Sequence, residues 1–248
     1  MSTRINLIEF FNENEKNTIL KPFIHYTFVP ATMSVVLHIL AGTKLEREME
    51  FLIWQRCSNL PIRNTNIFGL SMLADSYDLN PYVLTETEEF DYPEYRFKGY
   101  SKKDLRKSKI MNDTMLKIAK ERGINIKNKD EIPFHYFSRI VKKHAVLVRL
   151  NIKYLDWLDY NQSTILFLTM DEDNDFIVYH PANGCFEKIE KEMVQKSYKN
   201  LSEAKRPHQL LVLRENRSKN DIKLPNPSIE ITEKDKEFFE DYFSNKDN

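Results

Sequence analysis

Glycine and cysteine are both scarce in this chain. Only 5 of its 248 residues are glycine, and neither a GxGxxG nor a GxxxxGKS/T pattern occurs, which excludes the common phosphate loops that are built from glycine. Cys57 and Cys185 are the only cysteines, too few and too isolated for a disulfide framework or a zinc site. Cys57 lies in a helical, apolar stretch, where a free cysteine packs as a small hydrophobic residue. The sequence therefore predicts a reducing compartment, no cofactor and no metal ion.

Net charge and long apolar runs are also lacking. The chain has 37 basic and 37 acidic residues, so no long-range field attracts nucleic acid or an anionic membrane surface. No window approaches the roughly 18 apolar residues of a membrane span, and the N-terminus has no apolar stretch of signal-peptide length. With 41% hydrophobic residues, a chain of this length buries a substantial core. We expect a cytoplasmic protein with no nucleic-acid and no membrane partner.

The first half of the chain has the apolar spacing of helices. Pro30 precedes a dense apolar run that stops at Gly42, the pattern of a buried helix with proline in its first turn and glycine after its last. Further stretches with helical spacing follow, and the last of them closes at Gly123. A strand, “PYVLTET”, interrupts them. The expected helices are 30–41, 45–56, 68–76 and 104–122, with a short helix or arm at 4–12.

The second half is dominated by β-type runs. “HAVLVRLN”, “STILFLTM” and “DFIVYHP” are rich in β-branched and aromatic residues, and the acidic turn “DEDN” joins the last two. The expected strands are 144–151, 163–170, 175–181, 185–190 and 208–215, with a helix at 191–200.

This order of elements sets the expected domain organisation. Helices first and an antiparallel sheet second predict an α+β domain over residues 1–215. Residues 216–248 are expected to form a linker followed by a short C-terminal amphipathic helix.

Four segments keep the order and spacing of motifs in one peptidase family. “PFIHYTFVPATMSVVL” matches the proline, the alanine and the apolar helix of a Q-x5-C-G-P-A motif. “EFLIWQRCSN” and “FGLSMLADSY” stand where two further helices have I-W-R-E-like and G-L-A-L-A-A-like sequences, and “STILFLTMDEDNDFIVYHPANG” follows a strand, an acidic turn and a strand ending in D-P. Over about residues 20–200, the chain resembles the papain-like cysteine peptidase fold of the bacteriocin-processing (double-glycine leader) peptidases. That resemblance implies a helical half followed by an antiparallel sheet.

The catalytic residues of that family are absent from the matching positions. The resemblance places the nucleophilic cysteine at Phe28 and the glutamine that helps to hold the oxyanion at Pro22. It places the proton-accepting histidine at Ser163 and the aspartate that orients this histidine at His180. A thiolate needs the N–H groups and the dipole of a helix N-terminus, but phenylalanine supplies no thiol there. All four roles are lost while the apolar frame is kept, which predicts a peptidase fold without peptidase chemistry.

Three functions remain open. The first is a pseudopeptidase that binds a polypeptide segment or a protein partner in the groove of the fold, lined by Tyr26, Phe28, Ser163, Tyr179 and His180. The second is a hydrolase or acyltransferase with a site rebuilt around Ser163 and His180, which this alignment places on adjacent strands facing the groove. The third is an interaction protein whose binding surface lies outside the groove, for instance on the C-terminal tail. We expect the first, because no acid in the sequence is placed to orient a Ser–His pair.

Overall fold

The computed structural model describes residues 3–14, 17–24, 27–90, 99–155, 157, 163–204 and 206–214. They belong to one compact unit, Met1–Ser218, whereas the second unit, Lys219–Asn248, lies outside the described residues. The predicted linker and C-terminal helix at 216–248 and the predicted groove residue Tyr26 also lie outside them. Among the described helices, none combines the length and the apolarity needed to cross a bilayer.

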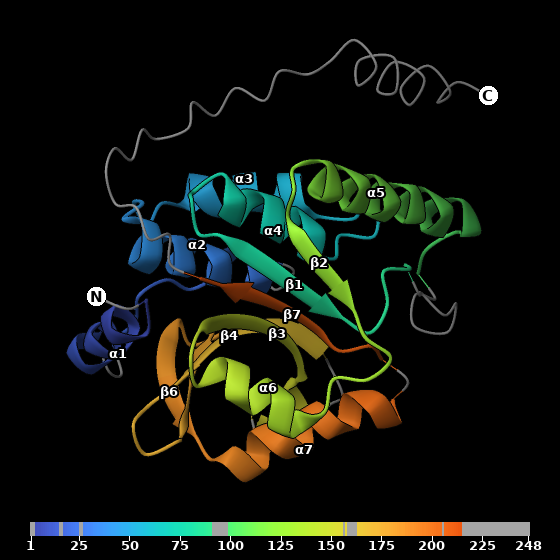
Figure 1. Ribbon diagram of the computed structural model, residues 1–248. Helices are drawn as coiled ribbons and strands as arrows, with labels where there is room; N and C mark the ends of the chain where they lie inside the picture. Colours follow the sequence, from blue (N-terminus) through green and yellow to red (C-terminus); the bar gives the residue numbers. More distant parts are fainter. Residues whose placement is uncertain are drawn as a thin grey trace. The chain divides into compact units, whose positions relative to one another are not determined.

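Within the described residues, seven strands form one sheet in the order β2-β1-β7-β3-β4-β5-β6 (Figure 1). β1 and β2 are parallel, and all other neighbours are antiparallel. The strands are β1 (Pro81–Thr85), β2 (Asn125–Asn128), β3 (Ala145–Asn151), β4 (Ser163–Met170), β5 (Phe176–His180), β6 (Cys185–Ile189) and β7 (Gln209–Leu213). The protein is therefore of the α+β class, with a mostly antiparallel sheet as the sequence predicts.

Helices cover both faces of this sheet. Figure 1 shows α2 to α5 above the sheet and α6 and α7 below it. The helices are α1 (Thr3–Asn14), α2 (Phe28–Ala41), α3 (Arg47–Cys57), α4 (Ile67–Asp75), α5 (Lys102–Glu121), α6 (Phe134–Val141) and α7 (Lys191–Glu203). The expected order of helices followed by a sheet is too simple, because β1 from the first half of the chain joins the interior of the sheet beside β7.

The inner strands of the sheet contribute to two separate cores because successive side chains point to opposite faces of a sheet. In β3, Ala145 and Leu147 join the core shared with α2 to α5, whereas Val146 and Val148 join the core under α6 and α7. A strand that is buried on both faces needs an unbroken apolar run. This explains why the strands were recognisable as continuous apolar stretches.

α2 is the central helix of the first core. Its residues from Val29 to Leu37 are all buried, and the helix lies against β4. Gly42 ends it at φ 68°, and its N–H donates to His38 O at 3.0 Å, the left-handed cap that glycine adopts at little cost. The prediction that this helix packs on the sheet with Phe28 at its N-terminal end is confirmed.

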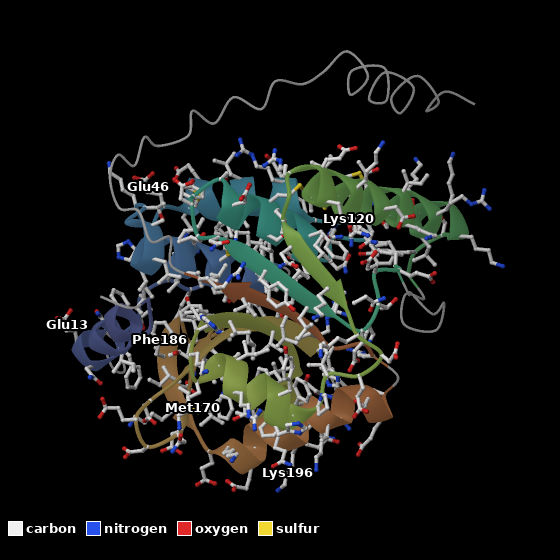
Figure 2. The ribbon with its side chains drawn as sticks, in the orientation of Figure 1. Glu13, Glu46, Lys120, Met170, Phe186 and Lys196 are labelled. Atoms are coloured by element: carbon white, nitrogen blue, oxygen red, sulfur yellow. The ribbon has the colours of Figure 1, made fainter. Side chains whose placement is uncertain are left out.

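α1 packs near the edge strand β6. Phe10 and Phe11 each meet the ring of Phe186 edge-on, with ring centroids 6.3 Å apart; Figure 2 labels Phe186 beside this helix. Such edge-to-face pairs stabilise packing beyond the buried area alone. The arm expected at residues 4–12 is therefore a helix that packs on the body of the unit.

Candidate functional site

The N-terminus of α2 is the position to which the resemblance assigns a catalytic cysteine. Phe28 is the first residue of α2, and its half-buried ring has no nucleophilic group. Its carbonyl accepts a hydrogen bond from Thr32 Oγ1 at 2.8 Å. The buried hydroxyl of Thr27 lies 2.7 Å from Ile24 O and within hydrogen-bond distance of the Glu50 carboxylate. The start of this helix is thus built around a carboxylate.

Glu50 of α3 supplies this carboxylate, and its side chain is fully buried. Oε1 accepts the N–H of Phe23 at 2.8 Å, and Oε2 lies 3.2 Å from Nη1 of Arg47. A sequence signal for Glu50 exists, because Glu50, Ile53 and Cys57 are the buried residues of α3 and are spaced along one helix face. An acidic residue on a buried stripe must find hydrogen-bond donors, and the chain before α2 provides them.

The segment 17–24, which connects α1 to α2, is held through its backbone. The N–H of Ile19 donates to Gly184 O at 2.7 Å, and the Tyr179 hydroxyl donates to Leu20 O. Burial raises the pKa of Tyr179 far above its usual value, so its hydroxyl remains a neutral donor. A Cβ on Gly184 would lie 2.8 Å from Leu20 O, and Gly184 has φ 72°. Only glycine allows this close approach without a shift of the backbone.

Pro22 lies in the same segment and is half-buried. Proline has neither a side-chain donor nor a backbone N–H, so this position cannot donate a hydrogen bond to an oxyanion. The guanidinium of Arg47 instead donates to the carbonyl of Lys21, one residue earlier.

Beside this network lie the exposed side chains of Phe23 and Arg47 and the half-buried ring of Phe51, which we name the Phe23 patch. Phe23 is 64% exposed. Its ring meets that of Phe51 edge-on at 5.7 Å, and Arg47 Cζ lies 5.9 Å from its centroid. Aromatic and arginine side chains of this kind dominate the energetics of protein interfaces.

Ser163 is the first residue of β4 and pairs with Asn151 of β3. Its hydroxyl accepts a hydrogen bond from the guanidinium of Arg206. Among the described residues, we find no hydrogen bond between this hydroxyl and a side chain that could act as a base. A guanidinium cannot accept the proton of an attacking hydroxyl.

His180 ends β5 and is only 6% exposed. Its ring stacks on Trp157 with centroids 3.9 Å apart, and Nδ1 accepts the N–H of Asn183 at 3.3 Å. Burial lowers the pKa of His180 below its usual value, and the nearby Glu187 carboxylate partly offsets this. The imidazole is therefore a neutral, packed ring.

The structure does not bring Ser163 and His180 together. β4 and β5 are paired antiparallel, with Leu168 opposite Val178. If this register is continued, His180 lies opposite Leu166, which is three residues from Ser163, roughly 10 Å along the strand. Tyr179 belongs to the core on the α2 side. Because neighbours on a strand point to opposite faces, His180 faces the α6 and α7 side, where Trp157 packs.

Neither cysteine is activated as a nucleophile. Cys57 is 1% exposed, and burial raises its pKa to about 12, although Arg56 partly offsets this effect. Burial and the carboxylate of Glu187, 3.8 Å from Sγ, also raise the pKa of Cys185. A reactive cysteine needs the opposite surroundings, with positive charge beside the thiol. Within the described residues, no three histidine, cysteine or acidic side chains converge as a metal site.

No family model, curated protein or solved structure matches this chain. The papain-like assignment therefore stays a prediction that depends on the four motif-like segments and their order. The α+β architecture is compatible with it, because the central helix begins where the motif expects and lies against β4.

Proposed function

We propose that the protein is a catalytically inactive, papain-like peptidase homologue that binds an extended polypeptide segment beside the N-terminus of α2. One observation carries the inactive part of the proposal: the buried Glu50 carboxylate accepts the Phe23 N–H and pairs with Arg47 at the helix start. A thiolate or an oxyanion formed at this place would lie near the buried Glu50 carboxylate, whose charge the half-exposed Arg47 guanidinium offsets only in part. Like charges oppose ionisation, so the site disfavours the intermediates of cysteine peptidase chemistry.

The Phe23 patch supports the binding part of the proposal. It is exposed, combines aromatic and cationic groups, and adjoins the position where the papain-like peptidases hold an extended substrate. An apolar side chain of a bound segment can pack on Phe23 and Phe51, while Arg47 attracts a backbone carbonyl or an acidic side chain.

The alternative of an enzyme rebuilt around Ser163 and His180 has less support. The strand register sets them apart along the sheet, and each already has a partner, Arg206 and Trp157 respectively. The alternative of a binding surface on the C-terminal tail concerns residues outside those described, and no observation favours it.

Binding is tested by selecting ligands from a library of random peptides and measuring their affinities. We expect Phe23→Ala to weaken the selected peptides by about tenfold, the effect of a modest hot-spot residue. Ile110→Ala is the matched control, because Ile110 is also an exposed apolar side chain, 46% exposed, but belongs to α5. Equal losses in both variants, or failure to select any peptide, would contradict the proposed groove.

Inactivity is tested by restoring the nucleophile. We expect the new thiol of Phe28→Cys to alkylate slowly at neutral pH, because the Glu50 carboxylate lies near the helix start. Combining it with Glu50→Gln removes that charge and should speed alkylation. Fast, stoichiometric labelling of the single variant, or cleavage of any selected peptide by the natural protein, would show that the site still supports catalysis.

A further inference from the structure

A cleft of about 600 Å³ opens on the side of the sheet that α6 and α7 cover, away from α2. This volume is within the usual range of small-molecule sites. Its polar walls come from two helices and consist of His135 and Ser138 of α6 and Lys191, Gln195, Lys199 and Ser202 of α7.

Tyr198 and His208, which we name the floor, also line the cleft, and His208 is paired with Glu86, which is not part of the lining. His208 is 2% exposed; Nδ1 lies 2.8 Å from Glu86 Oε1, and Nε2 lies 3.0 Å from Tyr198 O. The carboxylate and the carbonyl are both acceptors for N–H groups of the ring. The rings of His208 and Tyr198 stack at 3.8 Å. Both ring nitrogens of His208 already have hydrogen-bond partners within the protein. We therefore expect the residues of the walls to recognise a ligand.

The walls carry donors with no partner among the described residues. Lys191, Gln195, Lys199 and Ser202 follow one another at helical spacing, so one face of α7 turns toward the cleft. Some other lysines are paired with an acid, as Lys120 is with Glu88 at 2.6 Å. Among the described residues of the lining, Glu131 is the one acidic side chain. Two lysines against one carboxylate leave the walls with an excess of positive charge.

The two lysines stand at different ends of the cleft. Eight residues separate Lys191 from Lys199, which corresponds to about 12 Å along a helix. A single anion would require both side chains to converge over Gln195, whereas two anionic groups can each meet one lysine. Pro133 and Phe134 add apolar surface to the lining.

From this arrangement we propose that the cleft binds an elongated small molecule with an anionic group, phosphate or carboxylate, at each end. Lys191 and Lys199 hold the two anionic groups by charge-assisted hydrogen bonds, and the body of the ligand packs on Pro133 and Phe134. This site is independent of the proposed polypeptide groove, which lies beside α2.

The test uses hexane diphosphonate, with a phosphonate at each end, and hexylphosphonate, with only one, in calorimetric titrations at matched ionic strength. We expect the diphosphonate to bind at least about tenfold more tightly. Lys191→Gln or Lys199→Gln should reduce its affinity to that of the monophosphonate. Lys196→Gln is the matched control and should change nothing, because Lys196 is exposed on α7 but is not part of the lining (Figure 2). Suberate, a dicarboxylate of similar length, shows whether the natural ligand class is a phosphate or a carboxylate.

The proposal would be overturned if the two phosphonates bound with equal affinity, or if the Lys196→Gln control lost as much affinity as the other lysine variants. It would also be overturned if neither hexane diphosphonate nor suberate bound measurably. The lysine variants should fold normally because both side chains are exposed, and unchanged unfolding midpoints check this. Gln195→Glu provides a second variant, since a negative charge between the two lysines should weaken diphosphonate binding.

Discussion

Replacement of Glu50 by alanine tests whether the carboxylate at the start of α2 supports the fold. The change removes the acceptor of the Phe23 N–H and the partner of Arg47. It also removes an acceptor of the buried Thr27 hydroxyl, and an orphaned buried donor costs about 1–3 kcal/mol. The Arg47 side chain is 48% exposed and regains water, so it adds little, whereas the small void left at Glu50 adds roughly 1 kcal/mol. We expect the free energy of unfolding to fall by about 2–4 kcal/mol.

This loss is measured by urea and thermal unfolding, where about 2–4 kcal/mol corresponds to a fall of roughly 5–15 °C in the unfolding midpoint for a unit of this size. Glu50→Gln should lose less, because its amide oxygen still accepts the Phe23 N–H. Glu48→Ala is the matched control, since Glu48 is an exposed acid of the same helix. If Glu50→Ala stays within about 0.5 kcal/mol of the natural protein, as ordinary surface substitutions do, the carboxylate does not have this role.

Three further predictions concern other parts of the unit. Burial raises the pKa of Glu86, but hydrogen bonds from His208 hold this pKa below its usual value. The contribution of Glu86 to stability is therefore complete above the pKa of the unfolded chain and is lost as the pH falls through the pKa of the folded protein. Glu86→Gln should reduce the loss of stability at acid pH, measured by urea unfolding. Cys57, with its pKa raised to about 12, should resist alkylation at neutral pH until the protein unfolds, and rapid labelling of the native protein would contradict its burial. Gly184→Ala should destabilise the protein more than Gly123→Ala. Both glycines have positive φ, but only at Gly184 would a Cβ contact the backbone, at 2.8 Å. Equal unfolding midpoints of the two variants would refute this close approach.

The elements that the sequence predicts best are those whose pattern follows from burial alone. α2 is apolar on all sides because the core surrounds it, and β4 and β5 are continuous apolar runs because both their faces are covered. A segment that is apolar along its whole length has few alternative places in a fold. The positions of these elements were therefore predicted within about two residues, the usual accuracy of element boundaries.

Two elements were missed because tertiary contacts decide them. α6 has the sequence “FHYFSRIV”, whose aromatic and β-branched residues are typical of a strand. The ring of Phe137 stacks on those of Tyr198 and Phe176, with centroids 4.8 and 5.9 Å away, so packing on α7 and β5 favours the helix. β2, “NIKN”, is polar and is a strand only because it pairs with β1 at the edge of the sheet.

The arrangement of the candidate site could not be predicted because it depends on strand register and on contacts distant in sequence. Ser163 and His180 seemed to share one groove when only their strands were known, but a shift of one residue moves a side chain to the other face of a sheet. Glu50 was overlooked because its partner, the Phe23 N–H, lies 27 residues earlier. No local pattern reports such a pair.

Glu50 also shows how the start of α2 is stabilised although Phe28 supplies no nucleophile. The N-terminus of a buried helix favours a negative charge, because its first N–H groups have no partners within the helix. In the family that the sequence resembles, a thiolate is the anion at this place. In the present protein the Glu50 carboxylate lies there instead, and it binds the Phe23 N–H and the Thr27 hydroxyl that precede the helix. The carboxylate thereby joins α3 to the segment that precedes α2, and this connection requires no reactive group at the helix start.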